Sequence, residues 1–119
     1  SAILLLMGWA CIIGTYTLIT YPYIILFDLP LYSGVVFMIF SALALSVPSA
    51  PAGIGVVHYG LYLAIYVLAG DDVVSNNIDL VAAFAISTHF LMILFDILVG
   101  IGLMLLQKQT FKSSTLLNE

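Results

Sequence analysis

Arginine is absent from this chain, lysine occurs only as Lys108 and Lys112, and cysteine occurs once. Nucleic-acid binding needs a cluster of basic side chains, so we expect no nucleic acid among the partners. The single Cys11 lies inside an apolar run and has no second cysteine for an intramolecular disulfide. These absences remove two common classes, the nucleic-acid-binding module and the disulfide-stabilised domain.

Charge of either sign is scarce. Charged residues make up 7% of the 119 residues, 64% are hydrophobic and the mean hydropathy is +1.26. A soluble domain has about 25% charged residues, which cover its surface against water. We therefore expect an integral membrane protein, with several passes through the cell membrane.

Apolar residues form four runs, at about 2–27, 31–47, 56–69 and 80–106. The first and last exceed the roughly 20 residues that cross a bilayer. The second and third would form helices of about 26 Å and 21 Å, shorter than the hydrocarbon core of roughly 30 Å. The predicted fold is an all-α polytopic bundle of about four membrane helices (residues 1–106), followed by a tail (107–119).

A helix break separates the second run from the third. Pro48, Pro51, Gly53 and Gly55 interrupt the apolar sequence, and proline and glycine both disfavour a continuing helix. Two short helices beside such a break are typical of a discontinuous or re-entrant pair. The alternative is a tight turn between two antiparallel spans, and the apex at Ser49 would then reach the cytoplasm.

The break is also the predicted binding site. A helix start carries about half a positive charge and free amides, and the anions available in a membrane are lipid phosphates and carboxylates. His58 lies on the first turn of the third helix, on one face with Tyr62. The alternative for His58 is a hydrogen bond to a neighbouring helix. The candidate binding residues are Pro48, Ser49, Pro51, Gly53, Gly55, His58, Tyr62, His89 and Asp96.

His89 and Asp96 lie seven residues apart in the last run and therefore on one helix face. Ionisable groups at such depth are costly and usually face the bundle interior or a cavity. We expect them to serve the same site. The alternative for Asp96 is a structural hydrogen bond to another helix, including one outside this sequence.

Signatures of catalysis are missing. The sequence has no zinc-type cluster of histidine and cysteine, no phosphate-binding glycine loop with lysine and no Gly-x-Ser-x-Gly motif. We expect no catalytic residue, no metal and no cofactor.

Both lysines follow the last apolar run, and basic residues near a membrane end favour the cytoplasm. This predicts a cytoplasmic tail and an external polar loop at 70–79.

The segment from Ser46 to Tyr59 resembles the Pro-x-x-Pro-Gly-x-x-Gly-x-x-His/Glu motif of the lysylphosphatidylglycerol synthase transmembrane region family, which are flippase-like membrane proteins. Similarity continues through 82–89 and Gly100, and it covers about 43–106. Two positions depart from the family: Ala52 stands where glycine is frequent, and Asp96 stands where proline is common, so no role transfers to Asp96.

The resemblance implies a C-terminal part of a domain with about twice as many spans. Because the chain starts at Ser1 within an apolar run, we likewise expect that the remainder of the same domain lies elsewhere. The resemblance further implies that the protein handles an anionic lipid, such as a phospholipid or a polyprenyl phosphate.

The favoured function is therefore a flippase-like domain that binds and translocates or presents such a lipid. Two alternatives stay open, the membrane portion of a lipid aminoacyl- or glycosyl-transferase and a structural membrane subunit. A homo-oligomer is compatible with each of them.

Overall fold

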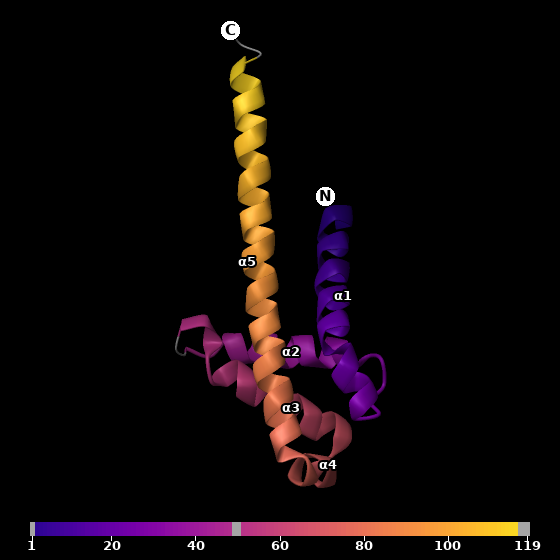
Figure 1. Cartoon of the computed structure of the whole chain (residues 1–119). Helices are drawn as coiled ribbons and strands as arrows, with labels where there is room; N and C mark the ends of the chain where they lie inside the picture. The colour runs from indigo at the N-terminus through magenta and orange to yellow at the C-terminus, as the bar shows by residue number, and fades with distance from the viewer. Residues whose placement is uncertain (1, 49–50, 117–119) are drawn as a thin grey trace. The chain divides into compact units, whose positions relative to one another are not determined.

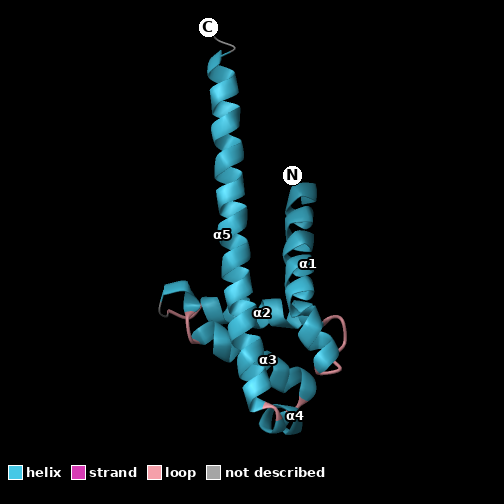
Figure 2. Cartoon of the chain, viewed as in Figure 1, coloured by secondary structure: helices cyan, strands magenta, loops and turns pink. Residues whose placement is uncertain are grey.

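The computed structural model describes residues 2–48 and 51–116, and their regular structure is entirely helical. Figure 1 and Figure 2 show the helices with short connecting loops. The elements are α1 (Ala2–Leu26), α2 (Ser33–Leu45), the 3₁₀ turn η1 (Pro51–Gly53), α3 (Val56–Ala69), α4 (Asp71–Asn76) and α5 (Ile78–Leu116). The predicted all-α class is confirmed.

Among residues 2–48 and 51–116, three segments are long and apolar enough to cross a membrane: Ala2–Leu26, Pro51–Ala69 and Ile78–Lys108. The α2 helix is also apolar but, with 13 residues, it is only about 20 Å long. By length and composition, the described helices are compatible with a membrane protein.

Two stretches differ from the expected pattern. The polar loop predicted at 70–79 contains α4, which begins after Gly70 at φ 88° and has Asp71 and Asp72 in its first turn. Acidic side chains stabilise the positive end of a helix, which explains why this polar stretch is helical. The last helix continues to Leu116 instead of ending near 106, because the polar residues that follow include no proline or glycine to stop it.

The chain divides into two units, residues 1–89 and 90–119. The first unit holds α1 to α4 together with the start of α5 (78–89), and the second holds the rest of α5. Within the first unit, α2 packs against both α1 and α3. Figure 1 shows α2 lying across the end of α1, with α3 returning beside α2.

The core of the first unit is built around Phe84 of α5. Its ring lies 4.8 Å from that of Phe37 in α2, and 5.0 Å from that of Tyr23 in α1, which meets it edge-on. Leu61 and Ile65 of α3 are also completely buried. Residues of α1, α2, α3 and α5 thus contribute to one hydrophobic core, within which three aromatic rings meet.

Glycine permits the close contact between α2 and α3. A methyl group added at Gly60 would lie 2.9 Å from the Phe40 carbonyl oxygen and 3.0 Å from the Ala44 methyl. Small residues at such crossings let helix backbones approach in membranes, where helix association depends on packing.

Replacing Gly60 with alanine should push α2 and α3 apart and lower the free energy of unfolding by about 1–3 kcal/mol, the usual cost of overpacking. Reversible unfolding of the detergent-solubilised protein would measure the loss. Gly14→Ala is the matched control, because no atom lies within 4 Å of a methyl group at Gly14. Equal losses in the two variants would contradict the close α2–α3 contact.

Candidate functional site

The chain leaves α-helical geometry between the end of α2 and the start of α3. Gly53 and Gly55 have φ values of 68° and 93°, in the left-handed region that favours glycine. Ala52 also adopts φ 60° and ψ 15°, a conformation that carries a penalty for a residue with a side chain. Gly53 is buried, and a methyl group there would overlap the side chains of Leu45 and Val57. The break is thus a tight, packed backbone turn.

A directed chain of hydrogen bonds ties this turn to α5. The backbone N–H of Gly55 donates to His58 Nδ1 at 3.4 Å. His58 therefore carries its proton on Nε2, which donates to His89 Nδ1 at 3.1 Å. His89 Nε2 then donates to the Ala52 carbonyl oxygen at 2.9 Å. The tautomers are assigned from this network, in which every donor meets an acceptor.

All four ring nitrogens of the two imidazoles have partners in this chain. A second proton on either ring would place two N–H groups against each other or against the Gly55 amide, so the arrangement suits two neutral imidazoles. His89 is 7% exposed, and its ring meets that of His58 edge-on at 4.8 Å. The two histidines are 31 positions apart in the sequence and lie on different helices, and together they hold a non-helical backbone segment in place.

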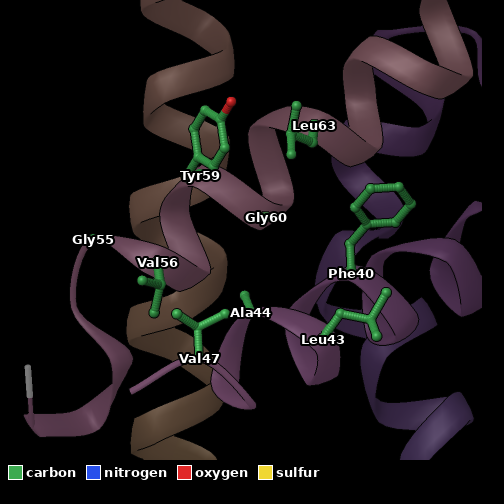
Figure 3. A pocket seen from close by; sticks show the side chains of 9 residues that line it. All are labelled: Phe40, Leu43, Ala44, Val47, Gly55, Val56, Tyr59, Gly60 and Leu63. Atoms are coloured by element: carbon green, nitrogen blue, oxygen red, sulfur yellow. The ribbon is translucent and has the colours of Figure 1, made fainter. Parts of the chain in front are cut away.

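An apolar groove of about 520 Å³ runs between α2 and α3 and ends at the break (Figure 3). On the α2 side it is lined by residues 40, 43 and 44 and by Val47, which follows the end of the helix, and the α3 side contributes 56, 59, 60 and 63 after Gly55. In Figure 3 the rings of Phe40 and Tyr59 stand on opposite sides of the groove, with Gly60 between them on the ribbon. The size is within the range of about 300–1,000 Å³ that is typical of ligand pockets.

A smaller cavity of about 330 Å³ is lined by α3 and the first turns of α5, and Tyr59 borders both cavities. His58 and Tyr62 both line it, as expected for residues four positions apart, and the first turns of α5 close it with aliphatic side chains. One imidazole of the hydrogen-bonded chain therefore borders a second apolar space.

The remaining predicted site residues are placed as follows. Pro48 and Pro51 are exposed on either side of the turn, and Ser49 lies outside the described residues. Asp96 is exposed on α5 in the second unit. The structure thus brings together Gly53, Gly55, His58, Tyr62 and His89.

Sequence reasoning missed two features of this site. One is the groove, although its lining residues repeat at i, i+3, i+4 and i+7 from Phe40 to Val47 and again from Val56 to Leu63, which is the sequence signal of a shared helix face. The other is a polar link between α1 and α5. Ser87 Oγ donates to the Phe84 carbonyl at 3.2 Å, so the Tyr23 hydroxyl is the donor in its 2.8 Å contact with Ser87.

No protein-family model, curated protein or solved structure matches this chain. In the part of the chain that the structure describes, the fold and site define an all-helical protein with three helices long and apolar enough to span a membrane and a histidine-bridged backbone break. The family resemblance remains a prediction from the motif.

The His58–His89 contact should show energetic coupling. Each single alanine variant already breaks the chain of hydrogen bonds. The double variant should therefore lose less unfolding free energy than the two single variants lose in sum, by about 0.5–1.5 kcal/mol. Unfolding free energies of His58→Ala, His89→Ala and the double variant in one detergent would measure this coupling. Strict additivity would show that the two rings stabilise the protein independently.

Replacing Ala52 with glycine should stabilise the protein. Glycine removes a left-handed penalty of about 1–2 kcal/mol, of which the greater freedom of the unfolded chain offsets part, leaving a net gain of about 0.5 kcal/mol. Ala83→Gly, at an exposed helical position of α5, should instead lose about 1 kcal/mol. Thermal unfolding compares the two variants, and a loss at both positions would contradict the observed geometry of Ala52.

Proposed function

We propose that this chain is a flippase-like membrane domain that binds an anionic lipid and translocates or presents it. The observation that carries this proposal is the position of the groove: an apolar space of about 520 Å³ ends where α3 begins, beside Gly55. An acyl or polyprenyl chain matches the apolar lining. A phosphate at the same end would meet the positive end of α3.

The two histidines hold this arrangement together. Lipid cannot satisfy a backbone carbonyl or amide, so an interrupted helix needs partners within the protein. His89 supplies one for the Ala52 carbonyl, and His58 supplies one for the Gly55 amide. In this proposal the imidazoles position the turn that meets the headgroup, and an incoming phosphate can compete for their N–H groups.

The membrane arrangement that suits this function has about four membrane segments, with α2 and α3 as a re-entrant pair around the break. The short α2 supports an embedded apex, since about 20 Å does not cross a core of roughly 30 Å. The lysines favour a cytoplasmic tail at a cell membrane, which is the orientation of this proposal. The resemblance of the 46–59 motif to flippase-like proteins agrees with this interpretation.

Filling the groove should weaken lipid binding. Leu43 lines the groove and is 61% exposed, so tryptophan at this position can occupy the space without disturbing the core. We expect Leu43→Trp to reduce crosslinking of a photoreactive phosphatidylglycerol, and its translocation in reconstituted vesicles, about tenfold, which corresponds to about 1.4 kcal/mol. Leu18→Trp is the matched control, because Leu18 is 77% exposed on α1 and lines neither cavity.

The same vesicles separate the possible functions. Phosphatidylcholine should crosslink less than phosphatidylglycerol, because its head carries no net negative charge for the start of α3. Equal labelling by both lipids would contradict an anion site at the break. Unchanged labelling in Leu43→Trp would remove the groove from the mechanism, and a chemically altered lipid product would favour a transferase.

A further inference from the structure

We propose that the face of α5 around Asp96 binds a partner membrane helix that lies outside residues 1–119 and carries a lysine or arginine at bilayer depth. The proposal is independent of the lipid-binding function. It rests on one unpaired carboxylate and on the distribution of charge along the chain.

Asp96 lies well inside the apolar segment Ile78–Lys108. The carboxylate is exposed, and its neighbours along the helix are large exposed apolar residues, with Phe95 at 44% and Ile97 at 52% exposure. No hydrogen bond or ion pair of Asp96 occurs among the described residues. Acidic residues inside membrane segments almost always pair with another group or face a polar cavity, so this face needs a partner.

The chain itself supplies no cation for this carboxylate. Residues 1–107 contain neither lysine nor arginine. Lys108 and Lys112 are on the same helix, about 18 Å and 24 Å further along its axis, beyond the reach of a side-chain contact. Both ring nitrogens of each imidazole already form hydrogen bonds, one to the other imidazole and one to the backbone turn.

Charge complementarity favours a basic helix over the other occupants. A second copy of this chain at the same depth would place one carboxylate against another, and like charges repel. Cationic lipid headgroups lie at the membrane surface, away from this depth. A lysine or arginine in a neighbouring helix is itself costly in lipid, so the pair removes an unpaired charge from each helix.

Gly100 gives a partner room to approach. It lies one turn beyond Asp96 on the same face, and no atom lies within 4 Å of a methyl group at that position. A small residue lets two helix backbones come close, and interhelical polar contacts form at such crossings.

The test uses the full chain with a donor fluorophore on its one cysteine, Cys11, which is exposed. It is reconstituted in phosphatidylcholine vesicles with acceptor-labelled polyleucine membrane peptides that carry lysine, leucine or glutamate at the centre. We expect energy transfer to show about fivefold stronger association with the lysine peptide than with the leucine peptide. The glutamate peptide should associate no better than the leucine peptide.

The variants decide the role of the carboxylate. Asp96→Leu should abolish the preference for lysine, and Asp96→Asn, which keeps hydrogen bonding but loses the charge, should reduce it. Asp79→Leu, in the first turn of α5, is the control and should retain the full preference. Circular dichroism of each variant confirms that the helices remain.

Three results would overturn the proposal. One is equal association of the wild-type chain with the lysine and leucine peptides, and another is an unchanged preference in Asp96→Leu. The third is Asp96-dependent energy transfer between donor- and acceptor-labelled copies without any peptide, because a second copy would then be the partner.

Discussion

The structure depends on one constraint, that the backbone polar groups of its interrupted segment must find partners within the protein. A continuous helix meets this constraint by itself, and an interrupted one does not. Here the interruption between α2 and α3 is closed by side chains: His89 from α5 binds the Ala52 carbonyl, and His58 binds the Gly55 amide. The two rings then bind each other, so the turn and the start of α5 form one hydrogen-bonded unit.

Packing at small residues complements this polar unit. Gly60 brings α3 against α2, while Phe84 gathers aromatic rings from α1 and α2 at the start of α5. The close crossing leaves larger side chains on either side, and the groove lies between them (Figure 3). The feature that lets the helices approach therefore also shapes the space proposed for a lipid chain.

Much of the fold could be predicted from the sequence because long apolar runs favour long helices and because Pro51, Gly53 and Gly55, clustered within five residues, disfavour a continuing helix. The polar stretch at 70–79 was harder, since Asp71 and Asp72 suit both a loop and a first helical turn. The pairing of His58 with His89 could not be predicted, because periodicity places residues on a helix face without showing which helices meet. The left-handed conformation of Ala52 could not be predicted either, since alanine does not favour that conformation.

The two histidines and Asp96 differ in how their polar groups are satisfied among the described residues. A neutral imidazole has one donor and one acceptor, so two of them can link a backbone amide to a backbone carbonyl with nothing left over. In the proposal for Asp96, a carboxylate at the centre of a membrane helix costs about 2.5–3.5 kcal/mol on insertion scales and needs a partner. The imidazole pair has all its partners within the first unit, whereas Asp96 has no hydrogen bond or ion pair among the described residues. Different constraints therefore act on these residues. His58 and His89 are constrained by the backbone turn that they bind, whereas Asp96 is constrained by the partner helix that we propose.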